Sequence, residues 1–535
     1  MGGLLSEGMM FPFNFGFIPS TLGGDGDSLD ILVLMDGPAQ VGCLIKVRMK
    51  PWKCPRLIAG LRPESSRRGG CEAERHGLDE RARTCVSAYC IPQMSSGILV
   101  GGVMLGPRSR REFLAVPTRG LAAALLAEAG RPLASQDVQL LDDLSHRCFL
   151  YFWEQSDPHS GITRDRARAD GGLHTSEGRY VGSTGATGFA LTALCIGAER
   201  GWISRRAARR RVQAALSSYA TGPAANIHGW FYHFVDIRSG ARYRTNEVST
   251  SDSTWLVAGA LTARQYFQED PQITRLATGI YERVDYRWML NQHPSFLAHG
   301  WTPESGFLPY RYDKYCQLAC MYLLGIGSPT HALDPDCWYA WGREPFHYSR
   351  FDYYGRTLLW TYQYPFSWWD FRNRRESRGL RINWFENSAT ATHAHRAFCM
   401  DLAREFPAYS ADIWGITSSD GPGGYQTWGG PPRTGHLDGS VVPCAAAGSL
   451  MFTPDLSLPA LHAMKTGFGG RIYQRYGFVD AFNPNTSWQA DDVIGIDVGI
   501  TLLSAENLRT GNIWKWFMAN AEAHRAFALA GIQPV

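Results

Sequence analysis

Apolar side chains recur at helical spacing over most of residues 136–535. Between Val138 and Glu154 they stand three or four positions apart, which is typical of an amphipathic helix. The same pattern covers Ala186–Arg200, Ser204–Tyr219 and Ser249–Gln268, and Ser249 or Thr250 can cap the last of these. Strand-like segments are few and short, such as Trp230–Val235. Further helices are expected over residues 271–286, 313–325, 388–405, 440–450, 456–466, 499–508 and 511–530.

This many helices, joined by aromatic and Gly-rich loops, favour an all-α (α/α) toroid over a bundle. The helices of such a toroid alternate between an inner and an outer ring. Loops at one end, carrying Trp and acidic residues, would then line a cleft. No long Pro/Gly linker divides residues 136–535, so we expect one large domain there.

Composition separates the front of the chain from this body. Residues 1–135 hold 16 Lys+Arg against 12 Asp+Glu, whereas residues 136–535 hold 37 of each. Trp52 is the one tryptophan in front of residue 135, and the other 17 follow it. A neutral, Trp-rich body argues against a nucleic-acid partner and suits sugar rings. No apolar run is long enough to span a membrane.

The first 48 residues contain a compact acidic motif. Asp25, Asp27 and Asp30 follow a Gly-rich turn and precede the apolar run Ile31–Met35, which predicts a buried strand. Three carboxylates at this spacing can bind a divalent cation, or can simply form an acidic turn. The segments G-F-I-P-x-T and D-G-D-x-x-D resemble soluble inorganic pyrophosphatase, with Ser28 where that family usually has Pro. The resemblance ends near residue 48, so we expect a truncated fragment without activity.

Residues 49–135 divide into two further segments. Residues 49–104 are rich in Arg, Cys, Ser and Gly and lack periodicity, which predicts a disordered or spurious linker. Residues 105–135 contain S-R-R-E-F-L-A, an apolar stretch and a small-residue site, in the order of a twin-arginine export signal. Such a signal belongs at an N-terminus, so we expect translation to start at Met104 and the product to be periplasmic or secreted. The full 535-residue chain would instead be cytoplasmic.

Several strings in the body resemble glycoamylase-like proteins, which include glycoside hydrolase family 144 and a domain of cyclic β-1,2-glucan synthases. The strings include ATGFALTALCIGAERGWISR (186–205), GWTPESGFLPYRYDKY (300–315), WFENSATATHAHRAFC (384–399) and DDVIGIDVGITLLSAENLRTG (491–511). The resemblance covers residues 137–535 in order. It implies an (α/α)6 barrel and hydrolysis of a β-linked glucan, with β-1,2-glucan expected. We expect a monomer that binds a glucan or oligosaccharide and needs no cofactor or metal.

Glycoside hydrolysis uses one carboxylic acid and a second carboxylate. Glu247 and Asp252 flank the start of a helix, so both face one cleft if Glu247 lies in the preceding loop. Asp497 stands among apolar neighbours in G-I-D-x-G, where burial would raise its pKa. Glu386 precedes a helix in F-E-N-S, and Asp313 lies before Y-L-L. Each of these acids can alternatively cap a helix or form a salt bridge.

Candidate substrate contacts come from acids in turns and from tryptophans. Glu304 lies in the turn P-E-S-G-F, and Asp420 lies in S-D-G-P-G-G. Aromatic rings often stack on sugars, although they more often fill the core, so we expect only two or three platforms. The candidate tryptophans are Trp230, Trp369, Trp384, Trp414, Trp428 and Trp488.

Gln317 departs from the pattern of the glycoamylase-like proteins. The resemblance implies a Glu four or five residues before Y-L-L, where this chain has Gln317, or Cys316 beside it. An amide cannot protonate a leaving group at neutral pH. Either another acid serves, such as Asp313 on the same helix face, or the protein is a glycan-binding pseudoenzyme.

Overall fold

The computed structural model describes residues 133–172, 180–222, 224 and 226–535, together with the backbone of six short strands in front. The chain forms two units, Met1–Ala115 and Val116–Val535. In the first unit, β1 (Asn14–Phe17) pairs antiparallel with β2 (Asp30–Val33). β3 (Val47–Arg48) lies parallel to β4 (Val86–Ser87), and β5 (Leu99–Val100) pairs with β6 (Val103–Met104).

The front unit bears on two of the sequence expectations. The strand expected at Ile31–Met35 is present as β2 and begins one residue earlier. The side chains of Asp25, Asp27 and Asp30 lie outside the described part of the structure, and so does the twin-arginine segment. The divalent-cation site and the export signal therefore stay predictions.

The body is an (α/α)6 barrel whose inner helices are buried on nearly every face. These are α3 (Thr184–Glu199), α5 (Thr250–Tyr266), α8 (Leu318–Gly327), α11 (Pro443–Ala447) and α13 (Gly495–Arg509). Between α8 and α11 the interior holds the 3₁₀ turns η2 (Leu359–Tyr362) and η3 (Pro365–Ser367). Uniformly apolar helices such as α3 must lie inside, because no face of theirs tolerates water.

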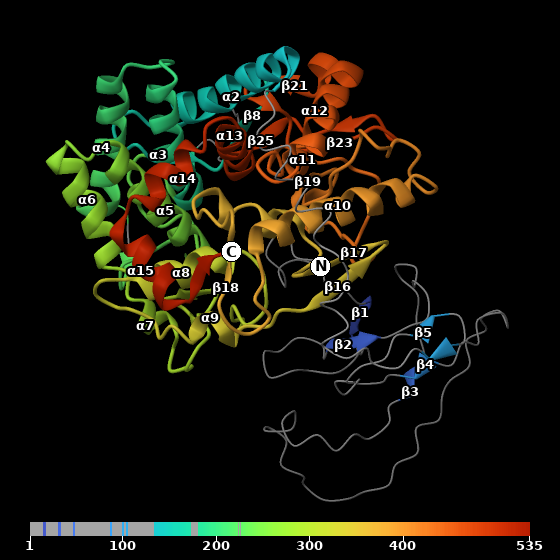
Figure 1. Ribbon diagram of the computed structural model, residues 1–535, viewed down its shortest axis with the longest axis horizontal. Coiled ribbons are helices and arrows are strands. Elements are labelled where there is room, and N and C mark those ends of the chain that lie inside the picture. The colour runs from blue at the N-terminus through green and yellow to red at the C-terminus, as the bar shows by residue number, and fades with distance from the viewer. Residues whose placement is uncertain are drawn as a thin grey trace, which may run out of the picture. The chain divides into compact units, whose positions relative to one another are not determined.

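Outer helices alternate with these along the chain and bury only one stripe. They are α2 (Ser135–Gln155), α4 (Arg205–Ala220), α6 (Pro271–Glu282), α10 (Trp384–Leu402) and α12 (Pro454–Phe468). In Figure 1, α4 and α6 lie outside α3 and α5, and α2 covers α13. The short helices are α7 (Tyr286–Met289), α9 (Cys337–Ala340), α14 (Asn512–Met518) and α15 (Ala521–Leu529).

The inner helices α3 and α5 cross unusually closely at two glycines. A Cβ placed on Gly188 would lie 2.2 Å from the carbonyl oxygen of Trp255. A Cβ on Gly259 would lie 2.0 Å from the carbonyl oxygen of Gly188. Real Cβ atoms do not approach backbone so closely, so the contact requires glycine on both helices.

Three inner helices begin directly after a short strand. β9 (Val181–Ser183) leads into α3, β13 (Val248–Ser249) into α5, and β25 (Asp492–Ile494) into α13. The Ser183 and Ser249 side chains cap α3 and α5 by accepting from a first-turn N–H. A Cβ on Gly185 would lie 2.4 Å from Asp252, and one on Gly495 would lie 2.9 Å from Ala186. The three helix N-termini therefore meet at one end of the barrel.

Other strands pair locally around the helix ends. They are β7 (Thr163–Arg164), β8 (Arg166–Arg168), β10 (Asn226–Ile227), β11 (Trp230–Phe231), β12 (Phe234–Asp236), β14 (Gly300–Thr302), β15 (Gly306–Phe307), β16 (Pro345–Tyr348), β17 (Phe351–Tyr354), β18 (Arg374–Glu376), β19 (Ser419–Gly421), β20 (Gly424–Gln426), β21 (Tyr473–Gln474), β22 (Gly477–Phe478), β23 (Phe482–Asn483), β24 (Trp488–Gln489) and β26 (Ile532–Pro534). Three of them orient the helix starts, since β12 and β7 pair with β9, and β8 pairs with β25.

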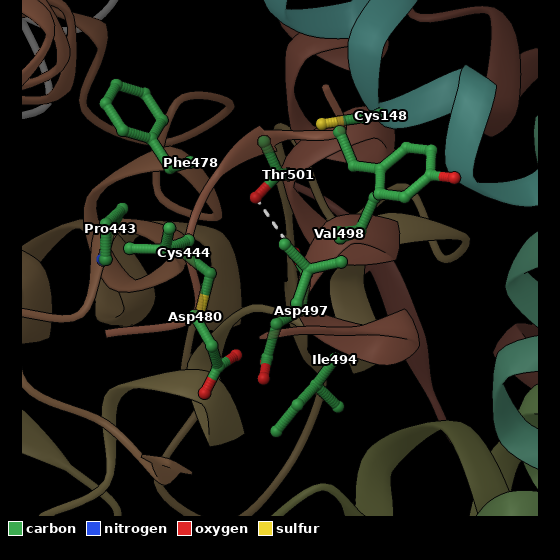
Figure 2. Close-up of a pocket in the computed structure, with 12 residues that line it drawn as sticks. Cys148, Pro443, Cys444, Phe478, Asp480, Ile494, Asp497, Val498 and Thr501 are labelled. Carbon is green, nitrogen blue, oxygen red and sulfur yellow. Dashed lines mark hydrogen bonds between the residues drawn. The ribbon is translucent and has the colours of Figure 1, made fainter. Parts of the chain in front are cut away.

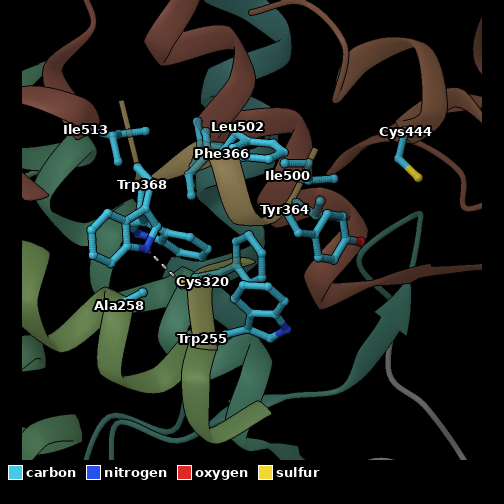
Figure 3. Close-up of a cluster of buried hydrophobic side chains, with 14 of the residues drawn as sticks. Trp255, Ala258, Cys320, Tyr364, Phe366, Trp368, Cys444, Ile500, Leu502 and Ile513 are labelled. Carbon is cyan, nitrogen blue, oxygen red and sulfur yellow. Dashed lines mark hydrogen bonds between the residues drawn. The ribbon is translucent and has the colours of Figure 1, made fainter. Parts of the chain in front are cut away.

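Aromatic side chains fill the middle of the barrel. Trp255 and Trp368 stack with ring centroids 5.8 Å apart, and Phe189 packs 4.9 Å from Trp368. Figure 3 shows Trp255, Phe366 and Trp368 facing Ile500 and Leu502 of α13. The interior is therefore a solid core, and any cleft lies at a barrel end.

Most expected helices are present, and four differ markedly in extent. The helix expected over residues 440–450 is only the five-residue α11. Residues 271–286 hold α6, which ends at Glu282, and only the start of α7. Residues 511–530 are divided at the buried Asn520, whose side chain donates to the carbonyl oxygens of Leu261 and Phe517. The helix expected over residues 313–325 begins only at Leu318, so Asp313 does not share a helix face with Gln317.

Candidate active site

Two buried carboxyl groups lie together at the end of the barrel where α13 begins. Asp497, in the first turn of α13, is 6% exposed, and Asp480, in the loop after β22, is 4% exposed. The Tyr364 hydroxyl donates to Asp497 Oδ1 at 2.6 Å. The Asp420 backbone N–H donates to Asp480 Oδ2 at 2.6 Å. We refer to Asp480 and Asp497 as the acid pair.

Burial favours a protonated carboxyl group in the acid pair. Oδ1 of Asp480 is buried without a hydrogen-bond partner among the described residues, and because an unpaired buried carboxylate oxygen is costly, this favours the protonated form of the Asp480 carboxyl group. Burial and the charge of Asp497 raise the pKa of Asp480 well above its ordinary range. Burial also raises the pKa of Asp497, to about 6, against the hydrogen bonds that it accepts. At neutral pH Asp480 holds the proton and Asp497 is ionised.

Arg166 braces the acid pair from one side. Its Nη1 donates to both oxygens of Asp420, at 3.0 Å and 3.1 Å, and its Nε donates to Asp165 at 3.2 Å. These charges, together with Asp480, raise the pKa of Arg166. Because Asp420 in turn bonds Asp480 through its backbone, Arg166 fixes the position of the acid pair.

A second acidic group lies at the start of α5. His233 Nδ1 is 3.0 Å from Glu247 Oε1, and His233 Nε2 is 3.6 Å from Asp252 Oδ2. The Ser249 hydroxyl donates to Asp252 Oδ2 at 2.5 Å. Glu247 lies in the loop before β13, as the sequence predicted, and so both acids reach His233. We refer to Glu247, His233 and Asp252 as the histidine triad.

The charges of the histidine triad stabilise one another. Burial alone would lower the pKa of His233, but the charges of Asp252 and Glu247 outweigh it and raise the pKa to about 9. Burial raises the pKa of Glu247, and the hydrogen bond from His233 outweighs this and lowers it overall. At neutral pH His233 is therefore a cation and Glu247 an ionised carboxylate, which is the protonation state opposite to that of Asp480.

The two groups lie at the same end of the barrel. The charge of Asp165 acts on His233 and also on Arg166, which holds the Asp420 side of the acid pair. A small pocket, lined among others by Asp480, Asp497 and Cys444, reaches the acid pair. Figure 2 shows Asp480 and Asp497 side by side in this pocket, beneath Cys444 and Thr501. A proton-bearing carboxyl and an ionised one thus occupy one barrel end, as acid–base chemistry requires.

Other predicted acids lie outside these two groups, although Glu304 pairs with Arg242, whose charge acts on Glu247. Asp313 is exposed in the loop before α8. Glu304 is exposed too and forms a two-pronged ion pair with Arg242, at 2.6 Å and 2.9 Å. Burial raises the pKa of Glu386 in α10. Its neighbour Phe385 packs against Trp514, which follows the C-terminus of α13, so Glu386 lies toward that end of α13. Asp497 lies at the opposite end of α13.

Gln317 lies in the loop that leads into the inner helix α8. It is the residue before α8 and is partly exposed. Tyr312, five residues earlier, hydrogen-bonds Ser251 at the start of α5. Burial and, to a smaller extent, the charges of Asp252 and Glu247 raise the pKa of Tyr312. The amide of Gln317 is therefore carried by the loop that flanks the histidine triad.

The predicted tryptophan platforms need correction. The rings of Trp230, Trp369, Trp384, Trp414 and Trp428 are at most 3% exposed, so they present no face to a sugar. Their large apolar surface is better placed in the core. Trp488, in β24, is partly exposed and is the one candidate of the six that solvent reaches.

Sequence analysis missed three site residues, two of which, Tyr364 and His233, carry no clear signal. Tyr364 follows η2, and His233 lies between β11 and β12, in a stretch expected to be a strand. Asp480 stands among apolar residues in G-F-V-D-A-F, the same signal that marked Asp497. Sequence spacing cannot show that segments about 230 residues apart meet at one barrel end.

The described residues contain no group of three or more His, Cys, Asp or Glu arranged to hold a metal ion. Within the described part of the chain, no helix is both long and apolar enough to cross a membrane.

Comparison with known proteins finds a match for each part of the chain. The Glycoamylase family model matches residues 309–521, and the Inorganic pyrophosphatase model matches residues 3–49. The body of the chain resembles the glycoamylase-like proteins. An exo beta-1,2-glucooligosaccharide sophorohydrolase of Parabacteroides distasonis is 26% identical over 437 residues, which are 75% of this chain and 58% of that protein. The chain thus spans less than two thirds of this relative.

A solved structure confirms the fold of the body. The endo-beta-1,2-glucanase of Chitinophaga pinensis, in complex with sophorotriose and glucose, superposes with a TM-score of 0.69 and 24% identity. The match covers 75% of this chain and 99% of that chain. At the front, an inorganic pyrophosphatase of Ralstonia nicotianae is 51% identical over 44 residues, which are only 25% of that enzyme.

Proposed function

We propose that the glycoamylase-like domain is a glycoside hydrolase that cleaves a β-1,2-linked glucan or its oligosaccharides. The observation that carries this proposal is the pairing, at one barrel end, of a protonated carboxyl in the acid pair with the ionised Glu247. Hydrolysis of a glycosidic bond needs one carboxyl group in each state. The choice of a β-1,2-glucan rests on the sophorohydrolase relative.

In this proposal the acid pair protonates the leaving oxygen and Glu247 acts as the second carboxylate. Asp252 and His233 act through Glu247, because they hold it in place and keep it ionised. Asp420 and Arg166 position the acid pair.

The test is to incubate the protein with linear β-1,2-glucan and measure new reducing ends. Glu247→Gln and Asp497→Asn should each lower kcat by at least ~100-fold, because Glu247→Gln removes the second carboxylate and Asp497→Asn breaks up the acid pair that delivers the proton. Glu269→Gln is the matched control, since Glu269 is an exposed carboxylate paired with Arg205 beyond the far end of α5. Full activity of both site variants would overturn the assignment.

Gln317 favours a second candidate, a glycan-binding pseudoenzyme. The resemblance implies a glutamate there, and an amide in that loop cannot supply a proton. Gln317→Glu should then create hydrolysis in a protein that binds β-1,2-glucan without cleaving it. Full hydrolysis by the unaltered protein would reject this candidate.

We further propose that the domain is exported through the twin-arginine route. The seven cysteines of the described body are free, which fits folding in a reducing compartment before export. Replacing Arg110 and Arg111 with Lys in a chain starting at Met104 should leave the protein in the cytoplasm, as fractionation would show. Unchanged export of this variant would refute the proposal.

We propose no activity for the pyrophosphatase-like front. It matches about a quarter of one such enzyme, too little to close the barrel around pyrophosphate. Mg²⁺-dependent phosphate release from pyrophosphate by the full chain would contradict this.

A further inference from the structure

A β-hairpin with a two-residue turn lies beside the acid pair. β19 (Ser419–Gly421) pairs with β20 (Gly424–Gln426), and Asp420 lies directly opposite Tyr425. Opposed residues of an antiparallel pair project from the same face. Tyr425 therefore projects on the side where Asp420 meets Arg166 and the acid pair.

Hydrogen bonds at its base hold this hairpin in position. Arg166 binds both oxygens of Asp420, and the Asp420 N–H donates to Asp480 at 2.6 Å. The indole N–H of Trp428 donates to Ser419 Oγ at 2.8 Å. A ring carried by this hairpin is therefore placed rigidly relative to Asp480 and Asp497.

Tyr425 differs from the tryptophans around it in exposure. It is 39% exposed, whereas Trp428, three residues later, is 3% exposed. Desolvation of its hydroxyl and the charges of Asp497 and Asp480 raise the pKa of Tyr425, and the hydroxyl also hydrogen-bonds Ser418. The hydroxyl end thus lies at the acid pair while part of the ring is open to solvent.

We propose that Tyr425 is the aromatic platform of the site, on which the glucosyl ring next to the cleaved bond stacks. The C–H groups of a β-linked glucosyl ring form an apolar face that matches a flat, rigidly held ring. Of the aromatic rings at the acid pair, Tyr364 is only 2% exposed, and so it cannot offer such a face. This proposal rests on the proposed glucan substrate.

The test measures binding apart from turnover. Calorimetric titration of a β-1,2-linked glucotriose into the full chain carrying Asp497→Asn reports binding without hydrolysis. Adding Tyr425→Ala should raise Kd by about 10- to 100-fold, because the stacking surface is removed. Tyr425→Phe keeps the ring and loses only the bond to Ser418, so its Kd should change less than about threefold. Thermal unfolding of both variants checks that the barrel is intact.

The outcomes separate this proposal from the proposed hydrolysis. A folded Tyr425→Ala variant that binds as tightly as its parent would overturn the platform, even if the unaltered protein hydrolyses glucan. Weak binding by Tyr425→Ala and normal binding by Tyr425→Phe would support the platform, even if no hydrolysis is found. Equal weakening in both variants would assign the effect to the hydroxyl and overturn the stacking role.

Discussion

The buried carboxyl group of Asp497 lowers the stability of the fold when it ionises, although the proposed site uses it. Its pKa is about 6 in the folded chain, against an ordinary value of 3.8. The folded state therefore holds more protons than the unfolded state between these values, and the free energy of unfolding falls as pH rises through them. Above pH 6 the barrel carries a buried carboxylate that it would be more stable without.

Asp497→Asn should therefore stabilise the barrel at high pH. The free energy of unfolding should rise by about 1–3 kcal/mol at pH 8, because the amide needs no ionisation and can still accept from Tyr364. At pH 4 the difference should nearly vanish, since Asp497 is then protonated in the folded chain. Urea unfolding at the two pH values measures this, and a pH-independent difference would contradict it.

Asp480 governs a different pH dependence, that of activity. Its raised pKa keeps the proton of the acid pair in place at neutral pH, and kcat/KM should fall as that proton leaves at alkaline pH. In Asp480→Asn the proton can reside only on Asp497, which accepts from Tyr364 and from the new amide. The alkaline limb of kcat/KM should then move to lower pH by at least about one unit. An unmoved limb would show that the acid pair does not supply the proton.

Only some of these site residues could be predicted from the sequence. Asp497 could be predicted because it stands among apolar neighbours, and Glu247 because it stands just before a helix start. The expected burial of Asp497 is confirmed. Asp480 and His233 act through contacts with distant segments, and local pattern carries no information about those contacts. The predicted tryptophan platforms were wrong in five of six cases, because tryptophan both fills cores and binds sugars and the sequence does not tell these uses apart.

At the scale of elements, the α3–α5 crossing is the tightest inner contact described above. Gly259→Ala should destabilise the barrel by at least about 2 kcal/mol, because the new methyl would lie on the backbone of Gly188. Gly279→Ala, in α6, is the matched control, since nothing lies within 4 Å of its added Cβ. That change should stabilise by roughly 0.5–1 kcal/mol through better helix propensity. Thermal unfolding compares the two, and equal effects would show that the crossing is not constrained.

Helices were the most predictable elements. Amphipathic outer helices such as α2 can be predicted from the spacing of their apolar residues. Uniformly apolar helices such as α3 can be predicted from the length of the apolar segment. The errors lie where a buried polar group ends a helix, as Asn520 does between α14 and α15. The short strands before the inner helices were not predicted, because two or three residues carry no period.

At the scale of the whole molecule, the barrel contains its own hydrophobic core. Every residue of the described core lies at or beyond Leu140, within the second compact unit. A chain limited to residues 133–535 should therefore unfold cooperatively, with a Tm within about 3 °C of that of the full chain. Calorimetry of both proteins tests this, and a large loss of stability would show that the front contributes to the barrel.

The buried tryptophans have a spectroscopic consequence. Trp230, Trp338, Trp341, Trp368, Trp369, Trp384 and Trp414 are among the largest side chains removed from water, so their emission should be blue-shifted in the folded protein. Unfolding would expose all of them and shift the emission strongly to the red. A sugar stacked on Tyr425 would touch none of these indoles. Intrinsic fluorescence should thus be a sensitive reporter of the fold and nearly blind to occupancy of the site.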